Sequence, residues 1–353
     1  MKIATITYSW AQNWGAVLQA YALVRYLNNE GYDAHLIDYR EFDNKLISTV
    51  KSIPDGIIDL LTIPASARRI RRYNEFRQNC LRLTKKCNTT DDLKSLNSEF
   101  DVFITGSDQV WNVGLGVCKD FYLHFAEQDK KKISYAASFG VSEIPEQYVA
   151  DTISGLGNID YISVRENSGK KIVESLTSNK AEVVLDPVFL LNKDQWLNVA
   201  SNNIISIPYI FVYPTQVTSQ LVNLVKKLKK ETGMIAISPF YVPGCKVIKD
   251  IGPREFIRYV ADSKYVVASS FHATAFSMIF NKPLACITHS QTGSRTTDLL
   301  KMLNLEECIV HDQENYPAIN MDFSQANILM KQLIDKSAMF IKNALGDKNE
   351  QIN

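Results

Sequence analysis

The sequence predicts an α/β protein built from two units, each a parallel β-sheet with helices on both faces. Short apolar segments with strand character alternate with longer segments of helical period through almost the whole chain. Gly or polar residues follow most of the apolar segments, as they do at the ends of strands. The chain has 353 residues, of which 46% are hydrophobic, and this suits two domains of roughly 100–200 residues each.

The first half of the chain opens on a β-rich segment, Lys2–Tyr8. In Gly15–Asn29 the apolar side chains recur at helical spacing, and Gly31 is expected to end that helix. Five further segments are predicted to be strands: Asp33–Tyr39, Phe100–Thr105, Lys132–Ala137, Tyr161–Val164 and Ala181–Leu185. This alternation predicts the first parallel sheet.

Residues 41–99 interrupt the alternation and are predicted to be mostly helical. They carry a basic run made of Arg68, Arg69, Arg71, Arg72 and Arg77. A charge run of this kind is most often the solvated face of a helix. The alternative is a surface that contacts an anionic acceptor or the membrane, which predicts a peripheral membrane contact through Arg68–Arg77.

A polar, Asn-rich stretch at 191–206 separates the halves, so the predicted domains are residues 1–198, which include the helical insert, and residues 199–353. The second half repeats the alternation, with strands predicted at Pro208–Tyr213, Met234–Ser238, Lys264–Ala268, Pro283–Thr288 and Cys308–His311. Helices are predicted at Val217–Lys230, Pro253–Val260, Ala273–Phe280 and Thr296–Leu303. A long terminal helix from Phe323 is expected to pack back on the first domain. The two domains are expected to face each other across a cleft lined by the carboxyl ends of their strands.

Composition excludes several classes of protein. Lys plus Arg is 39 and Asp plus Glu is 38, a net charge of +1, so a global electrostatic grip on nucleic acid is not expected. The six cysteines are scattered without a C-x-x-C pair, which favours free thiols in a reducing compartment. The N-terminus lacks the features of a signal peptide, and the longest stretch without charge, Tyr265–Asn281, is too polar for a membrane span. We therefore expect a cytoplasmic protein.

The common nucleotide and hydrolase signatures are absent. The sequence contains no G-x-G-x-x-G after a strand and no G-x-x-x-x-G-K-[ST], which argues against dinucleotide enzymes and P-loop NTPases. H-E-x-x-H and G-x-S-x-G are absent as well, which argues against zincins and serine hydrolases. No metal-spaced set of His, Asp or Glu is present either, so no metal is expected.

Three polar loops of the first half follow predicted strands. Asn13-Trp14-Gly15 offers a backbone that a ligand can approach and the free N–H groups of a helix start. Gly106-Ser107-Asp108 presents a hydroxyl, a carboxylate and backbone donors, which suit sugar hydroxyls, and the nearby Trp111 is a candidate for stacking on a sugar ring. Ser138-Phe139-Gly140 is the third loop. The alternatives are a helix cap at Asn13, and a capped helix start with Trp111 in the core.

Two further loops carry charges at strand ends. Arg165 ends a buried strand, and its planar guanidinium matches carboxylate or phosphate oxygens. The alternative is a structural ion pair between Arg165 and Glu166. Asp186, which precedes Pro187, is expected to form a turn, and the alternative is a place in the cleft.

The strongest single signal lies in the second half. Ser269-Ser270-Phe271-His272 follows an apolar strand and opens a helix. The free N–H groups of the helix start suit an anion, and the His272 imidazole can deliver a proton to it. Arg295, before another helix, is a candidate for an additional guanidinium. The alternatives are a structural histidine and a surface capping arginine.

Taken together, these loops resemble the polysaccharide pyruvyl transferase family. The segments that carry the resemblance occur in the order of the family from residue 4 to about 305: residues 13–23, 106–112, 134–140, 163–166, 185–188 and 269–272. The resemblance implies a GT-B-like fold of two Rossmann-like domains. It also implies transfer of a pyruvyl group from phosphoenolpyruvate to two hydroxyls of a sugar, which gives a cyclic ketal and phosphate in the synthesis of capsule or exopolysaccharide.

The resemblance also implies roles for residues. The donor-binding arginine and the catalytic histidine of the family correspond to Arg165 and His272. Asp108 is assigned as the base or hydroxyl binder. The remaining donor-binding candidates are Ser269, Ser270, Phe271 and Arg295, and the acceptor-binding candidates are Asn13, Trp14, Gly15, Gly106, Ser107, Trp111, Ser138, Phe139 and Gly140. Many members have Arg-Leu-His where this chain has Ser270-Phe271-His272, so Arg295 either replaces the missing arginine or the donor differs.

The expected partners are phosphoenolpyruvate, as a co-substrate and not a resident cofactor, and a glycan or lipid-linked sugar at the inner face of the cytoplasmic membrane. Two other functions stay open at this point. One is a nucleotide-sugar-dependent glycosyltransferase of the same GT-B architecture. The other is a non-catalytic glycan-binding protein.

Overall fold

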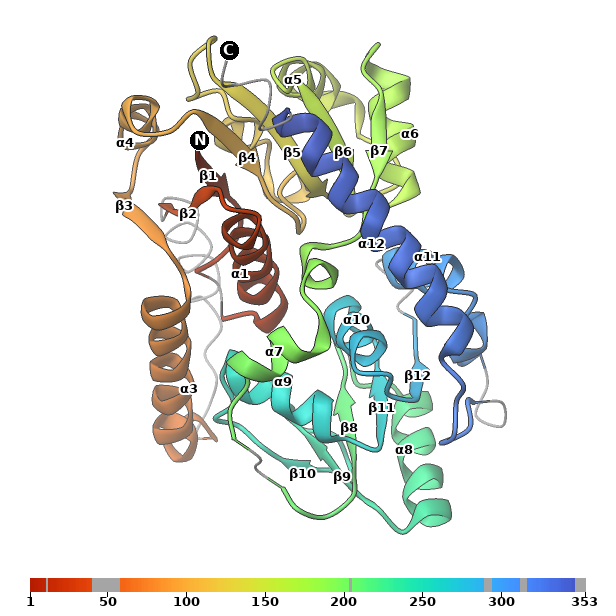
Figure 1. Cartoon of the computed structure of the whole chain (residues 1–353). Helices are drawn as coiled ribbons and strands as arrows, with labels where there is room; N and C mark the ends of the chain where they lie inside the picture. Colours follow the sequence, from red (N-terminus) through yellow and green to blue (C-terminus); the bar gives the residue numbers. More distant parts are fainter. Residues whose placement is uncertain (11, 40–57, 203–204, 289–293, 312–315, 347–353) are drawn as a thin grey trace. The chain divides into compact units, whose positions relative to one another are not determined.

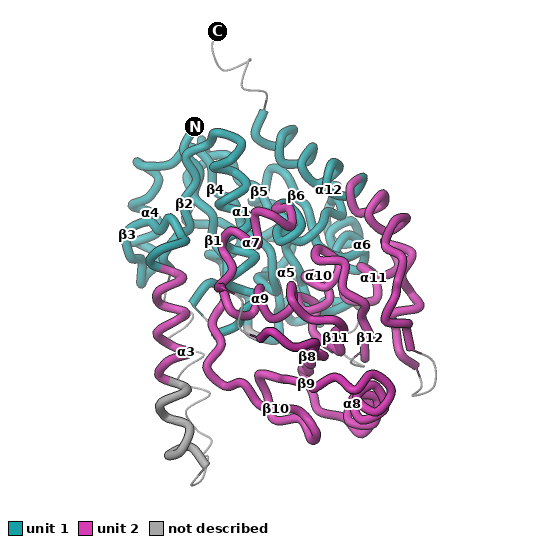
Figure 2. The backbone as a smooth tube through the Cα atoms, turned by 60° about the horizontal axis from the view of Figure 1, so that its bottom comes forward, with its two compact units in different colours: residues 1–54, 78–190, 332–353 teal, residues 55–77, 191–331 magenta. Residues whose placement is uncertain are grey.

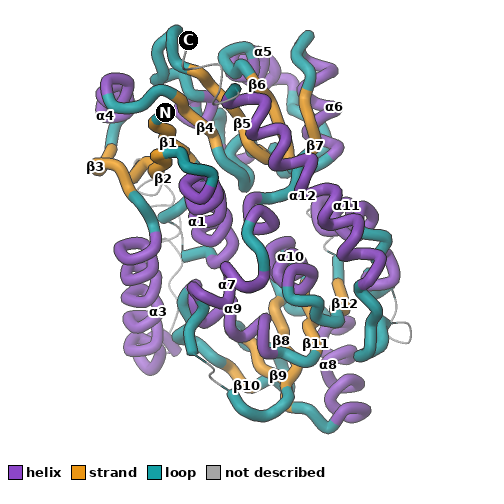
Figure 3. The backbone as a smooth tube through the Cα atoms, viewed as in Figure 1, coloured by secondary structure: helices purple, strands orange, loops and turns teal. Residues whose placement is uncertain are grey.

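A computed structural model of the chain describes residues 1–10, 12–39, 58–202, 205–288, 294–311 and 316–346. The chain divides into two compact units (Figure 2). Unit 1 comprises residues 1–54, 78–190 and 332–353, and unit 2 comprises residues 55–77 and 191–331. Each unit contains one parallel sheet whose strands are connected by helices and loops (Figure 3), which confirms the predicted fold class.

The sheet of unit 1 has seven strands in the order β3-β2-β1-β4-β5-β6-β7 (Figure 1). They are β1 (Lys2–Ile6), β2 (Asp33–Tyr39), β3 (Leu83–Cys87), β4 (Val102–Thr105), β5 (Lys131–Ala137), β6 (Tyr161–Val164) and β7 (Ala181–Val183). Neighbouring strands pair in parallel throughout. The sheet grows from β1 to β3 on one side and from β4 to β7 on the other, so its order reverses between β1 and β4.

Helices cover both faces of this sheet, because alternate side chains of a strand point to opposite faces. Ala4 and Ile6 point into a core that includes side chains of α5 (Glu146–Leu156) and α6 (Asn167–Leu176). The other face is covered by α1 (Trp14–Asn29) and by the end of α12 (Ser324–Leu345) (Figure 1). Gly31, at a φ of +82°, follows the end of α1, where only glycine adopts the left-handed conformation without strain.

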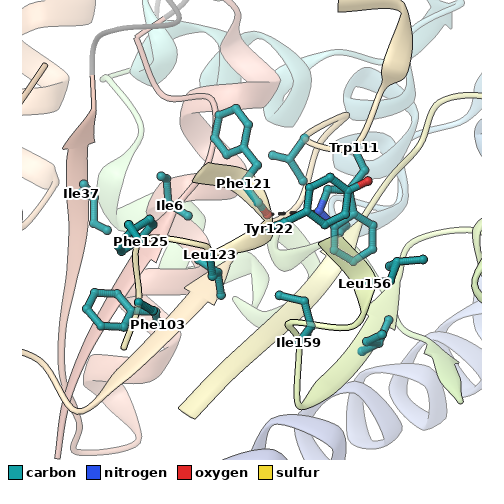
Figure 4. Close-up of a cluster of buried hydrophobic side chains, with 14 of the residues drawn as sticks. Ile6, Ile37, Phe103, Trp111, Phe121, Tyr122, Leu123, Phe125, Leu156 and Ile159 are labelled. Carbon is teal, nitrogen blue, oxygen red and sulfur yellow. Dashed lines mark hydrogen bonds between the residues drawn. The ribbon is translucent and has the colours of Figure 1, made fainter. Parts of the chain in front are cut away.

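An aromatic group fills the core between the sheet and α5 (Figure 4). The ring of Trp111 stacks on that of Tyr122 with centroids 5.2 Å apart, and its Nε1 donates a hydrogen bond of 3.1 Å to the carbonyl of Phe121. Phe139 packs against Trp111 at a centroid distance of 5.2 Å. Gly155 of α5 lies against the Tyr122 ring so closely that an added Cβ would be 2.4 Å from it.

The sheet of unit 2 has five strands in the order β10-β9-β8-β11-β12. They are β8 (Tyr209–Tyr213), β9 (Ile235–Ser238), β10 (Lys246–Val247), β11 (Tyr265–Ala268) and β12 (Leu284–Cys286). The helices α8 (Ser219–Thr232), α9 (Pro253–Asp262), α10 (Phe271–Ile279) and α11 (Ser294–Met302) connect or follow them. The strand order of this sheet reverses between β8 and β11.

The two faces of this sheet are also both covered. Ile210 and Val212 of β8 form a core with the apolar side of α8. Phe211, between them in sequence, points the other way and packs on Phe256 of α9 at a centroid distance of 6.1 Å. Phe256 in turn contacts Phe276 of α10, at 5.6 Å. Unit 2 is therefore a three-layer α/β arrangement like unit 1.

Shorter elements complete both units. They are α4 (Thr90–Lys94), η1 (Ser95–Ser98), η2 (Val113–Leu115), η3 (Lys119–Tyr122), η4 (Pro187–Leu190), α7 (Lys193–Val199) and η5 (Glu306–Cys308). The strand β3 was not predicted because Leu83–Cys87 is mostly polar and is an edge strand of the sheet. The strand predicted at Cys308–His311 is reduced to a single bridge between Cys286 and Ile309.

Two segments belong to a different unit from the residues next to them in the sequence, and for the terminal helix this was expected. The main change from unit 1 to unit 2 falls at Leu190/Leu191, close to the predicted boundary at 198/199. The end of α12 belongs to unit 1, where Ser337 accepts a hydrogen bond of 2.9 Å from the Leu185 amide and Lys131 donates one of 3.1 Å to the Leu345 carbonyl. The terminal helix thus packs on the first sheet.

The helix α3 (Ile58–Cys80) is the second such segment, because its residues up to Arg77 belong to unit 2 and not to the first domain. Arg68 forms an ion pair of 3.1 Å with Asp250, and Arg72 lies 3.7 Å from Glu255 and donates a hydrogen bond of 2.7 Å to the carbonyl of Asp250.

Gly252 makes this close approach possible, since a Cβ there would be 2.6 Å from the Cβ of Arg72. Arg71 pairs with Glu75 within the helix, and Arg77 is buried. Three arginines of the basic run therefore pair with carboxylates of unit 2, and a fourth is buried, which gives the run a structural use. The side chains of Arg68 and Arg71 remain exposed, at 55% and 75%, so the peripheral membrane contact stays a prediction.

Among the described residues, no helix combines the length and apolar content that crossing a bilayer requires.

Gly155→Ala tests the aromatic core. The added methyl group would collide with the buried Tyr122 ring, and overpacking of this kind costs about 1–3 kcal/mol. We expect Tm to fall by several degrees in a thermal unfolding scan, although alanine favours helix more than glycine. Gly157→Ala is the matched control, because its nearest neighbour would be at an ordinary 3.4 Å. Equal Tm values for the two variants would contradict the packing described.

Candidate active site

In unit 1 the polar loops meet where the strand order reverses. Ligands of open parallel sheets bind outside the carboxyl ends of the strands at such a point. The loops after β1 and β4 are joined there by a hydrogen bond of 2.6 Å from Thr7 Oγ1 to the Ser107 carbonyl. Gln19 of α1 donates to Thr7 Oγ1 at 2.9 Å. Gly106 permits this contact, because a Cβ there would be 3.1 Å from the Cβ of Thr7.

Asp108, directly after this contact, has a strained backbone. Its φ is +78°, a region that residues other than glycine seldom occupy and that costs of order 1–3 kcal/mol. The conformation is held by a hydrogen bond of 3.0 Å from the Ser138 amide to the Asp108 carbonyl and by one of 2.9 Å from the Gln109 amide to its carboxylate. The side chain of Asp108 is partly exposed, at 16%. Strain of this kind gathers at functional sites.

The facing strand β5 is irregular at the same level. Its pairing with β6 shifts register between Ser134 and Ala137, and Ala136 has a φ of +52°. Ser134 and Ser163 stabilise the irregularity, since each hydroxyl donates to the other residue's carbonyl, at 3.0 and 2.8 Å. Bulges often lie next to active sites, where they redirect side chains. Nothing in the sequence alone indicated this structural role of the two serines.

Arg165 lies at the centre of a buried charged cluster in unit 1. Its Nη1 is 2.9 Å from Asp186 Oδ2, its Nε is 3.8 Å from Glu166 Oε2 and its Nη2 is 3.9 Å from Asp108 Oδ1. Ser107 Oγ donates to Asp186 Oδ2 at 2.8 Å and accepts a longer hydrogen bond from Arg165. The Arg165 side chain is 2% exposed. Three carboxylates therefore surround one guanidinium.

The charges of this cluster stabilise one another. Burial lowers the pKa of the Arg165 guanidinium, but Asp186, Glu166 and Asp108 outweigh it and raise the pKa above its ordinary value. Glu166 also accepts a hydrogen bond of 2.7 Å from Ser138 Oγ. Asp186 forms the predicted turn, because its Oδ1 accepts from the Val188 amide at 3.1 Å. The guanidinium expected to bind the donor is thus occupied by carboxylates of its own unit.

Several predicted acceptor-binding side chains are buried instead of presented to a ligand. Trp111 and Phe139 belong to the aromatic core, so neither is a platform for a sugar ring, and Trp14 is buried as well. Gly15, Gly106, Ser107 and Ser138 are buried backbone or hydroxyl positions that shape the loops.

Asn13 is exposed, and its side chain accepts a hydrogen bond of 3.2 Å from the Ala16 amide, so it caps α1. Gly140 is partly exposed and has a φ of +68°. Asp108 is the acidic side chain of this region that reaches solvent in part.

In unit 2 the polar loops meet at the other reversal of strand order, between β8 and β11. The Ser269 amide donates to the Tyr213 carbonyl at 3.1 Å, and the Thr215 amide donates to Ser269 Oγ at 2.7 Å. These bonds join the loops after the two strands, as Thr7 and Ser107 do in unit 1. Ser269 therefore positions the loop that leads into α10, and Thr215 is a partner that the sequence did not indicate.

His272 lies in the first turn of α10. Ser270 is the N-cap residue, in an extended conformation and without a hydrogen bond from its side chain to the helix. The imidazole of His272 is half-buried and packs edge-on against Phe271 at a centroid distance of 5.3 Å. Phe271 itself is buried, which leaves Ser269, Ser270 and His272 as the partly exposed side chains of this loop. An imidazole beside the N–H groups of a helix start suits an anionic ligand.

Arg295 is half-buried in the first turn of α11, a helix that packs against α10. The residues before it, 289–293, lie outside the described part of the chain. The placement of Arg295 next to the helix that carries His272 keeps it as a candidate for the additional guanidinium of unit 2.

Four of the six thiols are unsuited to nucleophilic catalysis. Burial raises the pKa of Cys87 and Cys245 to about 11 and that of Cys286 and Cys308 to about 12. Thiols with such values stay protonated at neutral pH and are poor nucleophiles. All six cysteines lie in the described part of the chain and are present as thiols.

A family model described as polysaccharide pyruvyl transferase matches residues 13–291, which include the loop of Asp108 after β4 in unit 1 and the strands β8 and β11 of unit 2. The chain belongs to this family. It is therefore a transferase, and the resemblance seen in the sequence is confirmed. No curated protein matches the sequence.

Solved structures show the same fold. A protein of Listeria monocytogenes described as a UDP-N-acetylglucosamine 2-epimerase is similar at a TM-score of 0.51, with 12% identity over 96% of this chain and 90% of its own. An α-glucosyltransferase in complex with UDP-glucose and DNA is similar at a TM-score of 0.50, with 10% identity over 98% of this chain and 91% of its own. These likenesses confirm the GT-B-like fold of two Rossmann-like sheets.

Proposed function

We propose that this transferase moves the pyruvyl group of phosphoenolpyruvate to two hydroxyls of a glycan or a lipid-linked sugar, with a cyclic ketal and phosphate as the products. The observation that carries the proposal is the family match over residues 13–291. Family membership favours pyruvyl transfer over a nucleotide-sugar glycosyltransferase and over a non-catalytic glycan-binding protein.

Unit 2 is the donor side in this proposal. Phosphoenolpyruvate carries a phosphate and a carboxylate, so it needs N–H donors and cations. The start of α10, with Ser269 and Ser270, supplies the donors, and Arg295 at the start of α11 supplies a guanidinium in place of the arginine that the family has at Ser270. His272 is the general acid, because it is partly exposed at that same helix start.

The chemistry balances with one acid and one base. The His272 imidazolium gives its proton to the methylene carbon of phosphoenolpyruvate, which becomes a methyl group and leaves an oxocarbenium-like centre at C2. The first sugar hydroxyl attacks C2 and loses its proton to a base. The C2–O bond to phosphate then breaks, and the second hydroxyl attacks the same carbon. One of the two hydroxyl protons ends on the departing phosphate. Such proton transfers typically accelerate a reaction by about 10²–10⁴.

Unit 1 is the acceptor side. Asp108 is the base or hydroxyl-binding group, because it is the partly exposed carboxylate at the reversal point and its strained backbone fixes its position. The loops of Asn13 and Gly140 flank the acceptor in this proposal.

The proposal uses no metal and no resident cofactor, and phosphoenolpyruvate enters and leaves as a co-substrate. Its acceptor belongs to the synthesis of capsule or exopolysaccharide, at the inner face of the cytoplasmic membrane.

Phosphate release from phosphoenolpyruvate in the presence of a panel of glycan and lipid-linked acceptors, followed by the ketal methyl signal in NMR, tests the proposal. His272→Ala and His272→Gln should reduce turnover by about 10²–10⁴, because the acid is lost. Their Tm should stay near that of the unmodified protein, since the side chain is only half-buried. Full turnover in either variant would remove His272 from its role.

Arg295→Met tests the donor side separately. Loss of a charge-assisted hydrogen bond should weaken phosphoenolpyruvate binding in calorimetry by about tenfold or more. Lys301→Met, which removes an exposed charge from the same helix, is the matched control and should change binding less than threefold. Equal affinities in the two variants would contradict the role of Arg295. A Tm raised by UDP-glucose and not by phosphoenolpyruvate would support the glycosyltransferase alternative.

A further inference from the structure

We infer that Arg165 is a positioning residue and not a donor ligand. Its guanidinium holds the carboxylates of Asp108, Glu166 and Asp186 together and so gives unit 1 a site for neutral hydroxyl groups instead of anions. This inference rests on the proposed function, in which one of the two substrates is a sugar.

The Arg165 guanidinium lies between three carboxylates of unit 1. The carboxylates come from three loops, after β4, β6 and β7, and Arg165 follows β6 between them. Distances of 2.9, 3.8 and 3.9 Å join the guanidinium nitrogens to the three carboxylates. Each nitrogen named in these contacts faces a different carboxylate. The guanidinium therefore connects the loops that follow three strands and holds them in position.

The charges of this cluster do not balance. Three carboxylates and one guanidinium have a net charge of −2 by their ordinary ionisation, and the cluster is nearly sealed from water. An anionic ligand that approached the cluster would be repelled by the excess carboxylate charge, because water screens charges only weakly in a buried site. Phosphoenolpyruvate is such an anion. A sugar is neutral, and its hydroxyls donate hydrogen bonds that carboxylate oxygens accept.

The backbone of Asp108 is left-handed, with a φ of +78°. A left-handed aspartate persists only where its surroundings hold it. The Ser138 amide donates to its carbonyl, the Gln109 amide donates to its Oδ1, and Arg165 Nη2 lies 3.9 Å from that same oxygen. Arg165 thus orients the one member of the cluster that reaches solvent in part, and acts on the acceptor through it.

Calorimetric titration of phosphoenolpyruvate into full-length Arg165→Met and Arg165→Lys tests the inference. If Arg165 only positions the carboxylates, both variants should bind phosphoenolpyruvate with an affinity within about threefold of that of the unmodified protein. A donor ligand predicts binding weaker by about tenfold or more in Arg165→Met, because a charge-assisted hydrogen bond is lost. Arg165→Lys keeps the charge and folds more readily, so a tenfold loss in this variant alone would also overturn the inference.

A second measurement does not depend on phosphoenolpyruvate. Without the guanidinium, the ionised carboxylates of Asp108, Glu166 and Asp186 repel one another, and the phenol of Tyr135 interacts electrostatically with Asp186 as a further titratable group. The repulsion lowers the stability of Arg165→Met progressively as the pH rises and the carboxylates lose their protons. We expect the difference in Tm between Arg165→Met and the unmodified protein to be larger at pH 8 than at pH 5.

Rescue separates this electrostatic role from simple packing. Glu166→Gln keeps the hydrogen-bond acceptor for Ser138 and removes one charge, so it should raise the Tm of Arg165→Met at pH 8 although it lowers that of the unmodified protein. Absence of rescue together with a pH-independent loss of Tm would overturn the inference. If the unmodified protein binds no phosphoenolpyruvate, the proposed function fails, and the positioning role is then decided by the pH dependence and the rescue.

Discussion

The connections between parallel strands of a sheet are right-handed. When such a sheet grows first to one side of its starting strand and then to the other, the connecting helices therefore lie on opposite faces of the sheet on the two sides of the reversal. The loops that leave the two strands at that point diverge. In this chain the reversal lies between β1 and β4 in unit 1 and between β8 and β11 in unit 2. In both units a hydroxyl side chain joins the two loops, Thr7 to Ser107 and Ser269 to Thr215. The positions of the polar side chains follow from this constraint.

The two reversal points differ in chemistry. That of unit 1 is acidic, with three carboxylates around one buried guanidinium. That of unit 2 offers the amides of a helix start and an imidazole. A reaction between a multiply charged anion and a neutral sugar needs both kinds of site, since the conditions that bind one substrate do not bind the other. This division supports an assignment of the donor to unit 2 and of the acceptor to unit 1.

Much of the fold could be predicted from the sequence because strand and helix periodicity is local. The strands at Asp33–Tyr39 and Tyr161–Val164 have the predicted limits, and the first helix differs by one residue. The edge strand β3 was not predicted, because its mostly polar residues form a strand only when they pair with β2. The positions of the candidate loops at the strand ends were predictable, since motif residues followed each strand, while the roles of their residues stay predictions. Trp111 and Arg165 show the limit of that reasoning, because an aromatic ring or a guanidinium near a strand end can equally point into the core.

The sequence by itself determined the α/β class, the family, and the loops that hold the candidate site residues, because each depends on residues close together in the chain. Tertiary structure alone decided that α3 belongs to unit 2, that Trp111 stacks on Tyr122, and that Arg165 is enclosed by carboxylates. Each of these depends on contacts between residues far apart in the chain, such as Arg68 with Asp250 and Asp108 with Arg165. Local periodicity does not contain such contacts, because burial and ion pairing depend on which surfaces the whole chain brings together.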